Sequence, residues 1–248
     1  MAISSMISVR NVVVEYGRGV NTVRAVEDVS LDVERGESLA LIGPSGCGKT
    51  SLLFAMAGLY QAAAGTIEIG DVPVNGPRKE VALILQNAGL LPWKTVSQNA
   101  NLSLLLNKEY PQKTADAVLE DLGLGEVKSR FPAELSEGMK RRVGVARALS
   151  TSPSVMLMDE PLASLDTLTK ERIQDLFLDL WKQHQFALVL VTHDIEEAAF
   201  LGQRIIVLTD QPARTKRIVA NPEMGEKDYR SASAFRQTVA ELRGALAS

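Results

Sequence analysis

Hydrophobic positions near the N-terminus predict strands of two kinds. Residues 7–16 and 26–34 are rich in β-branched side chains with partial alternation, and each segment ends in a turn that contains glycine. Such segments are typical of antiparallel strands. Residues 38–42 form a short apolar run without alternation, as expected of a strand that is covered on both faces. The pattern therefore predicts two antiparallel strands followed by a buried one.

Further along the chain, strand and helix patterns alternate. Residues 155–158 and 187–192 have the same buried-strand pattern, and residues 167–183 between them carry apolar side chains at helical spacing. A helix is also predicted over residues 49–57, soon after the first buried strand. This alternation predicts βαβ units, a parallel sheet and an α/β fold.

The pattern changes between residues 87 and 150, where it is helical and interrupted by proline and glycine. This predicts a helical subdomain inserted into the α/β core. The predicted helices there span residues 96–106, 114–122 and 137–149. The predicted organisation is a single domain with an α/β core (1–86 and 151–210), the helical subdomain (87–150) and a tail (211–248) that packs on the core. In the tail, a strand is predicted over 216–220 and a helix over 232–246.

Composition narrows the class of protein. The 248 residues are 46% hydrophobic and 23% charged, enough for a sizeable core. The net charge is −3, which argues against a nucleic-acid partner held by broad electrostatics. The single cysteine excludes an internal disulfide and fits a reducing compartment. No stretch approaches the roughly 18 apolar residues that span a bilayer, so we expect a soluble protein that can still sit against a membrane partner.

The segment between the first buried strand and the following helix matches the phosphate-binding pattern G-x-x-x-x-G-K-[ST]. In such a loop, glycines let backbone N–H groups turn toward phosphate oxygens, the lysine reaches the β- and γ-phosphates, and the last hydroxyl binds Mg²⁺. The alternative is a glycine turn that binds nothing. The candidate nucleotide-binding residues here are Gly43, Pro44, Ser45, Gly46, Cys47, Gly48, Lys49, Thr50 and Ser51.

Two adjacent carboxylates, Asp159 and Glu160, follow the buried run at 155–158. A parallel sheet places ligand chemistry at the carboxyl ends of its strands. We therefore expect Asp159 to reach a Mg²⁺ ion and Glu160 to polarise an attacking water. The alternative is that the two acids form a solvated turn.

Cys47 lies inside the phosphate loop, beside a helix N-terminus. That environment lowers the pKa of a thiol, which predicts alkylation of Cys47 that ATP blocks. The alternative is that cysteine is simply a small residue that fits the turn.

A third element resembles the signature motif of the ATP-binding-cassette (ABC) ATPases: Leu-Ser-Glu-Gly-Met, beginning at Leu135. The resemblance extends over about residues 7 to 210. It includes Tyr16, placed like the aromatic residue that stacks on adenine, and Gln86, placed like the glutamine of the Q-loop. It also includes Ser164-Leu165-Asp166, like the D-loop, and Thr192-His193-Asp194, like the segment with the switch histidine.

This resemblance implies a P-loop, RecA-like nucleotide-binding core with an N-terminal antiparallel β subdomain. It also implies a head-to-tail homodimer in which ATP lies between the phosphate loop of one subunit and the signature helix of the other. Catalysis is then assigned to Glu160, His193 and Lys49, and Mg²⁺ binding to Thr50, Gln86 and Asp159. The remaining nucleotide contacts fall to Tyr16, Ser136, Gly138 and Asp166.

The signature departs from the usual LSGGQ at Glu137 and Met139. A carboxylate facing phosphate at about 7 Å would cost roughly 2 kcal/mol at an effective dielectric of about 20. We therefore expect Glu137 to point to solvent beside its own helix N-terminus, while Ser136 and Gly138 keep their roles. The departure also leaves open a degenerate cassette that binds ATP without hydrolysing it. His193 has a structural alternative too, as a histidine satisfied by its neighbours.

A finer resemblance lies in Q-N-x-x-L-L-P-W, from Gln86, and H-D-I-E-E-A, from His193, which look like the nitrate, sulfonate and taurine import ATPases. It implies a separate membrane permease, an indirect partnership with a solute-binding protein, and a peripheral place at the cytoplasmic face of the membrane. Leu91, Pro92 and Trp93 are expected to contact the permease. The alternative is that Trp93 fills the core of the helical subdomain.

Two other functions remain open at this stage. One is a soluble, non-transport ABC ATPase that regulates another protein, and the other is the ATPase subunit of an exporter. The sequence does not indicate which solute is transported, because in this family the permease and the binding protein select it.

Overall fold

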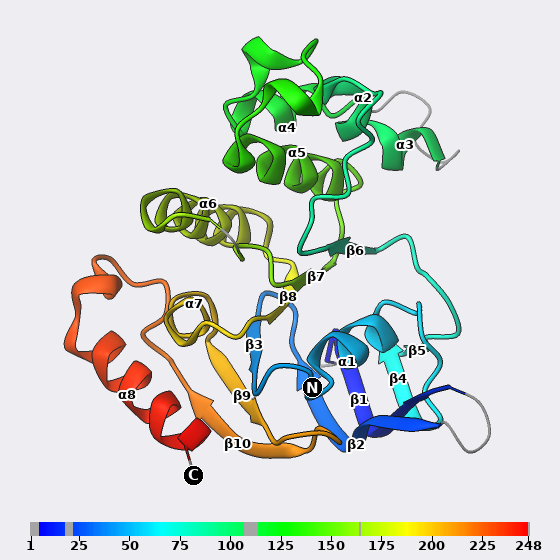
Figure 1. Cartoon of the computed structure of the whole chain (residues 1–248), viewed down its shortest axis with the longest axis vertical. Coiled ribbons are helices and arrows are strands. Elements are labelled where there is room, and N and C mark those ends of the chain that lie inside the picture. The colour runs from blue at the N-terminus through cyan, green and yellow to red at the C-terminus, as the bar shows by residue number, and fades with distance from the viewer. Residues whose placement is uncertain (1–4, 18–21, 107–113, 164, 248) are drawn as a thin grey trace.

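Figure 1 shows the computed structural model, which describes residues 5–17, 22–106, 114–163 and 165–247. Its strands are β1 (Ile7–Tyr16), β2 (Val23–Val33), β3 (Ser38–Ile42), β4 (Ala64–Ile69), β5 (Val72–Pro73), β6 (Val81–Ile84), β7 (Val155–Asp159), β8 (Ala187–Val191), β9 (Arg204–Leu208) and β10 (Thr215–Ala220). Its α-helices are α1 (Lys49–Met56), α2 (Val96–Ala100), α3 (Leu102–Leu106), α4 (Asp116–Asp121), α5 (Glu137–Leu149), α6 (Thr167–His184), α7 (Ile195–Leu201) and α8 (Ser233–Ala247). Single turns of 3-10 helix are η2 (Gly125–Val127), η3 (Pro132–Glu134) and η4 (Tyr229–Ser231).

The larger sheet has the order β10-β9-β3-β8-β7-β6. Strands β9, β3, β8, β7 and β6 are parallel, and β10 is antiparallel to β9. Every residue of β3, β7 and β8 is buried, which explains their unbroken apolar sequences. The predicted α/β class is confirmed.

The smaller sheet is antiparallel, with the order β2-β1-β4-β5. Alternate residues of β1 and β2, such as Val12 and Val29, point into a core that they share with Leu52 of α1 and Val189 of β8. Helix α1 therefore packs between the two sheets. This packing fixes the start of the helix near the carboxyl end of β3.

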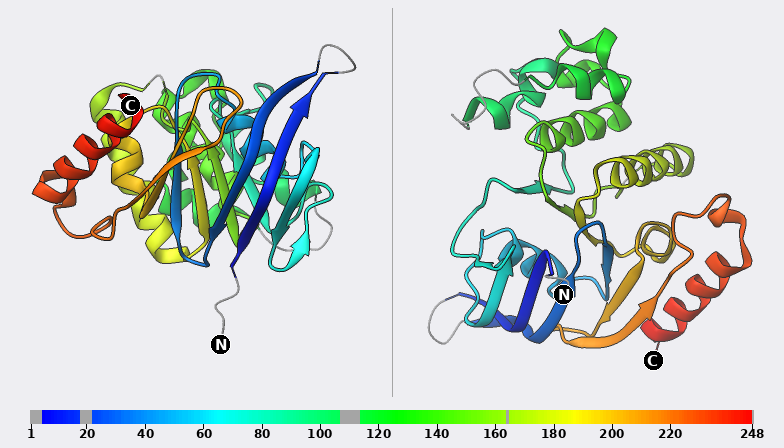
Figure 2. Two further views of the ribbon diagram at one scale, coloured as in Figure 1. Left: turned by 90° about the horizontal axis from the view of Figure 1, so that it is seen from below. Right: turned by 180° about the vertical axis from the view of Figure 1, so that it is seen from behind.

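Helices α2 to α5 form a group at the top of Figure 1, and α5 packs on β6 through a core that includes Val143, Ala82 and Ile84. At the other side of the molecule, α8 covers α7 and β10 through Val219, Val239 and Leu242. The amide of Asn221 donates to the backbone oxygens of Ala199 (2.7 Å) and Gly202 (2.8 Å), which ties the tail to the end of α7. Figure 2 shows α8 and the antiparallel sheet on opposite sides of the molecule.

The helix predicted over 96–106 is interrupted at Asn101, which ends α2. Its side-chain Nδ2 donates to the backbone oxygen of Ser97 at 2.8 Å, and its Oδ1 accepts the backbone N–H of Ala115 at 2.9 Å. An asparagine that bonds the backbone in this way competes with continuous helix. Among the described residues, no helix is both long enough and apolar enough to cross a lipid bilayer.

Candidate active site

The loop of residues 43–48 joins β3 to α1, and two of its glycines have backbone angles that other residues rarely adopt. The φ angle is +76° at Gly46 and +124° at Gly48. A Cβ atom on Gly48 would lie 2.3 Å from the backbone oxygen of Ala25 in β2, whereas a Cβ on Gly46 would meet no atom within 4 Å. Gly48 therefore allows the loop to pass against β2, and Gly46 lies on its open side, together with the exposed Ser45.

Lys49 is folded over this loop. It is only 5% exposed. Its Nζ donates to the backbone oxygens of Gly43 at 2.9 Å and of Pro44 at 2.8 Å. A phosphate bound in the loop would compete with these neutral carbonyls for the ammonium, and charge-assisted bonds are the stronger kind. That Lys49 binds phosphate stays a prediction.

The expectation that the helix N-terminus lowers the pKa of the Cys47 thiol is wrong, while alkylation of Cys47 that ATP blocks stays a prediction. The residue is 2% exposed. Burial raises the pKa of its thiol, and the Lys49 ammonium, 3.9 Å from Sγ, opposes this effect only in part. A buried thiol that stays protonated reacts slowly. Cys47 is instead the small side chain that fits the turn, since even a Cβ on Gly43 would approach its Sγ to 3.1 Å.

Thr50 and Asp159 meet where α1 begins and β7 ends. The Thr50 hydroxyl donates to Asp159 Oδ1 at 2.8 Å. Burial raises the pKa of the Asp159 carboxyl, and the hydrogen bond from Thr50 opposes this rise. These are oxygen ligands of the kind that Mg²⁺ prefers. Among the described residues, no group of three or more His, Cys, Asp or Glu side chains is placed to hold a metal ion.

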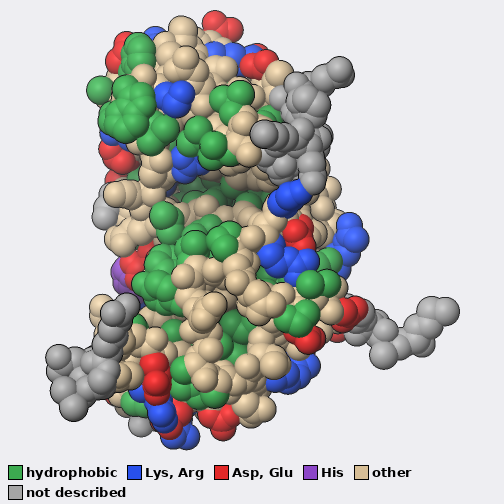
Figure 3. All heavy atoms as spheres, turned by 90° about the vertical axis from the view of Figure 1, so that its right-hand side faces the viewer, with side chains coloured by type: hydrophobic (Ala, Val, Ile, Leu, Met, Phe, Trp, Pro, Cys, Tyr) green, Lys and Arg blue, Asp and Glu red, His purple; other side chains and the backbone are tan. Residues whose placement is uncertain are grey.

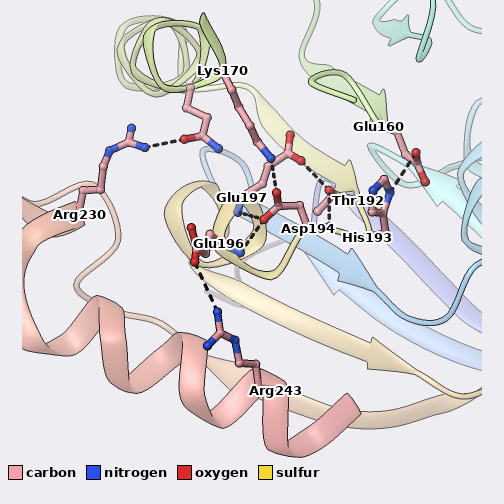
Figure 4. Close-up of polar contacts among 10 residues, drawn as sticks. Glu160, Lys170, Thr192, His193, Asp194, Glu196, Glu197, Arg230 and Arg243 are labelled. Carbon is pink, nitrogen blue, oxygen red and sulfur yellow. Dashed lines mark hydrogen bonds and ion pairs between the residues drawn. The ribbon is translucent and has the colours of Figure 1, made fainter. Parts of the chain in front are cut away.

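Glu160 and His193 lie at the ends of adjacent parallel strands, β7 and β8, and the structure brings their side chains together (Figure 4). His193 Nδ1 is 3.1 Å from Glu160 Oε2. The Glu160 backbone has a φ of +45°, and its N–H donates to Val191 at 2.8 Å. The side chain of His193 is 60% exposed, and the alternative of a histidine satisfied by its neighbours stays open, since Glu160 is such a neighbour. That Glu160 and His193 act in catalysis stays a prediction.

An ionic network that the sequence analysis missed lies behind His193, in the turn of residues 192–194. The Thr192 hydroxyl donates to Glu197 Oε2 at 2.5 Å and accepts the backbone N–H of Asp194 at 3.0 Å. Asp194 begins α7, where its carboxylate accepts the backbone N–H of Glu197 at 3.1 Å, and it forms an ion pair with Lys170 of α6. Figure 4 shows these side chains converging from α6, α7 and the end of β8.

Glu197 is the most deeply buried acid of this network, at 2% exposed. Burial raises the pKa of its carboxyl from 4.5 to about 7, and the hydrogen bond from Thr192 opposes this rise. Its Oε1 is buried and has no hydrogen-bond partner among the described residues. The site therefore disfavours the charged form of Glu197.

We expect Glu197→Gln to change how stability depends on pH. Between pH 4.5 and 7, the folded protein holds a proton on Glu197 that the unfolded chain has released, so this group lowers stability as pH rises through that window. The difference between the two pKa values corresponds to about 3 kcal/mol. Urea unfolding at several pH values should therefore show the wild type losing about 3 kcal/mol relative to the variant between pH 4 and 8.

The control for this experiment is Glu196→Gln, which removes a neighbouring carboxylate on the same helix whose side chain is 64% exposed. Its stability profile should follow the wild type. If the wild type and Glu197→Gln lose stability in parallel across this range, the burial of a proton at Glu197 is contradicted.

The signature segment lies at the start of α5. Ser136 is the N-cap, and its hydroxyl accepts the backbone N–H of Met139 at 3.3 Å. The Glu137 side chain is 64% exposed and pairs with Lys140 at 2.7 Å, so the expectation that it points to solvent is confirmed. Gly138 faces α6, where a Cβ would meet Thr169 Cγ2 at 3.0 Å.

Three predicted residues remain apart from the centre formed by Thr50, Asp159, Glu160 and His193. Ser136 and Gly138 line a cavity of about 520 Å³ that contains no residue of the phosphate loop. Asp166 is exposed and caps α6, accepting the backbone N–H of Thr169 at 3.1 Å. Ser164, from the same predicted motif, lies outside the described residues.

Tyr16 and Gln86 lie on the rim of the site. Tyr16 is 47% exposed at the end of β1, and its phenol oxygen accepts a hydrogen bond from Gln211 at 3.4 Å. Gln86 is exposed just after β6 and lines a cavity of about 930 Å³ together with Asp159, Leu90 and Pro92. This cavity lies between the start of α5, the segment after β6 and the end of β7, and Figure 3 shows one face of the molecule hollowed near its middle.

The segment after Gln86 is bound to α5. The Arg147 guanidinium donates to the backbone oxygens of Ala88 at 2.5 Å and Gly89 at 2.9 Å. Ala88 also packs so closely on Gly144 that a Cβ there would lie 3.3 Å from the Ala88 Cβ. We call the hydrogen bonds from Arg147 to Ala88 and Gly89 the Arg147 clamp. Trp93 follows this segment and is 70% exposed, so the interpretation that it fills the core of the helical subdomain is wrong.

A family model described as ABC transporter matches residues 26–163, which hold the phosphate loop, the signature segment and the carboxylates at the end of β7. This chain belongs to the ABC transporter family. It is an ABC-type, ATP-binding ATPase, and the resemblance seen in its motifs is confirmed.

Curated relatives of this ABC ATPase cover most of its length. The taurine import ATP-binding protein TauB of Yersinia pestis bv. Antiqua is 42% identical over 77% of this chain and 76% of its own. The aliphatic sulfonates import ATP-binding protein SsuB of Bacillus licheniformis is 39% identical over 82% of this chain and 80% of its own.

Solved structures of ABC transporter cassettes are similar in fold to this chain. The dimeric structure of MJ0796, a bacterial ABC transporter cassette, is similar with a TM-score of 0.75 and 30% identity, over 87% of this chain and 98% of that chain. A dimeric post-hydrolysis state of the same cassette, bound to ADP and Pi, has a TM-score of 0.72 and 29% identity, over 86% of this chain and 99% of that chain.

Proposed function

We propose that this ABC ATPase is the energy-supplying subunit of an importer, and that it hydrolyses MgATP as a homodimer. The contact between Glu160 and His193, directly beside the hydrogen bond from Thr50 to Asp159, carries the hydrolytic part of the proposal. It places a carboxylate and an imidazole at one edge of the sheet, next to the oxygen atoms suited to a metal ion.

Each residue of the site has one proposed task. Lys49 and the backbone N–H groups of residues 45–51 bind phosphate, and Tyr16 stacks on the base. Thr50, Asp159 and Gln86 provide protein ligands for Mg²⁺. Bound MgATP supplies the phosphoryl group that is transferred and the metal charge that stabilises it.

Glu160 then orients the attacking water, and His193 holds Glu160 and the phosphate end of the site in place. Because Ser136, Gly138 and Asp166 lie apart from the phosphate loop, we propose that they act on the nucleotide of a second copy of this chain. The dimeric state of the similar cassette supports this arrangement.

The import role rests on the relatives, two of which are named for taurine and for aliphatic sulfonates. We propose a small solute of this class, or nitrate, as the cargo. A separate membrane permease would carry it, a solute-binding protein would deliver it, and this subunit would sit at the cytoplasmic face of the membrane. None of the observations above favours the export or the non-transport alternative.

The proposed permease surface is the segment of residues 91–93, where Trp93 is the exposed aromatic anchor and follows Pro92, which lines the 930 Å³ cavity. A large aromatic that becomes buried at the centre of an interface contributes about 2 kcal/mol or more. We therefore expect Trp93→Ala to reduce the permease recovered with tagged protein from native membranes by roughly tenfold or more. Quantitative mass spectrometry of the purified complex measures this.

The matched control is Tyr60→Ala, which removes an aromatic that is 44% exposed and contacts Phe54 of α1. It should leave recovery of the permease unchanged. Recovery of only soluble partners with the wild-type chain would reject the importer and support the regulatory alternative. A permease that moves solute outward in vesicles would support the exporter.

A further inference from the structure

The turn that carries His193 is held by side chains outside the proposed chemistry. Thr192 and Asp194 flank the histidine, and both are bonded to residues of helices rather than to the phosphate loop. We propose that Lys170 and Glu197 are positioning residues that set His193 against Glu160, and that they couple this contact to the position of α6. This inference rests on the proposed roles of His193 and Glu160.

Lys170 provides the link to α6. Its side chain is 20% exposed, and it forms the ion pair with Oδ2 of Asp194. The other oxygen of that carboxylate accepts the backbone N–H groups of Glu196 at 2.8 Å and Glu197 at 3.1 Å. Both carboxylate oxygens are therefore used, which fixes the rotation of the Asp194 side chain and the turn beside it.

Glu197 supports the turn from the opposite side. It accepts the Thr192 hydroxyl, and Lys170 from α6 and Asp194 and His193 from the turn are the charged or titratable groups that act on it. Arg243 of α8 is 3.5 Å from Glu196, the exposed neighbour on the same helix. Lys170 therefore pairs with Asp194 and also lowers the pKa of the Glu197 carboxyl, so its removal would leave Asp194 without this ion pair.

Through Lys170, the turn is tied to the residue proposed to meet the second subunit. Lys170 lies one helical turn after the cap of α6, and its backbone N–H donates to the backbone oxygen of Asp166 at 2.9 Å. A displacement of Asp166 when two subunits close would move Lys170, and with it Asp194 and His193. The network would thus report closure to the hydrolytic centre of the same chain.

The first test removes either partner of the ion pair between Lys170 and Asp194, and compares this with the removal of another lysine of α6. Lys170→Met and Asp194→Asn are expected to lower kcat for MgATP hydrolysis by the full-length chain roughly tenfold, with KM changed by no more than about twofold. Lys170→Arg should restore most of the activity. Lys182→Met, at the far end of the same helix, makes the same substitution away from the turn and should match the wild type.

A second test uses pH. Glu197→Gln keeps the size of the side chain and removes its charge, so it should matter only where Glu197 is ionised. The ratio of wild-type kcat to variant kcat is expected to be about one at pH 6 and to rise several-fold by pH 8, since the carboxyl pKa is about 7. A ratio that does not vary with pH would overturn the role given to Glu197.

A third readout is spectroscopic, because the chain has only two histidines. In protein labelled with ¹⁵N-histidine, Lys170→Met should shift or broaden the ring signals of His193, while His184, at the end of α6, serves as the internal reference. Unchanged His193 signals, normal kcat, or an equal loss of kcat in Lys182→Met would overturn the proposal.

His193→Ala distinguishes a failure of the proposed function from a failure of the positioning role. Normal turnover in that variant would reject the proposed function of the site. A large loss in His193→Ala combined with normal turnover in Lys170→Met would reject only the positioning role of the network.

Discussion

Glu160→Gln is expected to abolish nearly all hydrolysis while leaving ATP binding intact. Gln has the same shape as Glu but is a much weaker base, and a positioned general base contributes about 10²- to 10⁴-fold to a rate. Single-turnover hydrolysis should therefore fall roughly 100-fold or more, with nucleotide affinity changed by no more than about twofold. The unhydrolysed nucleotide should also trap the dimer, which size-exclusion chromatography with and without MgATP would detect.

A double-mutant cycle with His193 provides the control. Glu160 and His193 are 3.1 Å apart, so their effects should not add. His193→Gln alone is expected to cost a large part of the activity, and the double variant should be little worse than Glu160→Gln. Fully additive losses, or near-normal turnover in Glu160→Gln, would remove Glu160 from its assigned role.

Gly48→Ala is the second substitution with a large expected effect. The new Cβ would lie 2.3 Å from the backbone oxygen of Ala25, and the φ of +124° is strained for any side chain. The loop or β2 must shift, which we expect to cost about 3 kcal/mol of stability and to lower ATP affinity roughly 100-fold, because the phosphate-binding N–H groups move with the loop. Thermal unfolding and titration with a fluorescent ATP analogue measure the two effects.

Gly46→Ala is its matched comparison in the same loop. Its φ of +76° is also left-handed, but the added Cβ meets no atom within 4 Å. We expect a stability loss of about 1 kcal/mol and a smaller loss of affinity than at Gly48. Equal losses at both positions would show that backbone angle, and not the contact with β2, controls the loop.

The sequence predicts the elements that are long or fully buried, and misses the short ones. Strands β1 and β3 have the predicted bounds, and α6 differs from its prediction by one residue. Strand β4 was missed because only Ile67 and Ile69 of its six residues are buried, so it has little hydrophobic pattern. Strand β6 has four residues at the edge of its sheet, whereas β9 was missed although four of its five residues are buried and apolar. The division of the chain at residues 86 and 150 stays a prediction.

The nucleotide centre can be predicted from the order of the motifs, because motifs that follow parallel strands meet at the carboxyl ends of those strands. It does not reveal contacts that depend on tertiary packing. Lys170 and Asp194 are 24 positions apart, with nothing in the sequence that pairs them. The raised thiol pKa of Cys47 arises from burial and reverses the expectation drawn from a helix N-terminus alone.

The clamp of Arg147 on Ala88 and Gly89 also has a mechanical consequence. It ties the segment after Gln86 to the end of helix α5 opposite Ser136, so the two would move together. A helix of this length spans about 20 Å, so a tilt of about 10° at the clamp would displace the far end by about 3 Å. A displacement of that size is enough to break a hydrogen bond, so a small tilt of α5 at the Arg147 end would decide whether Ser136 meets its proposed partner.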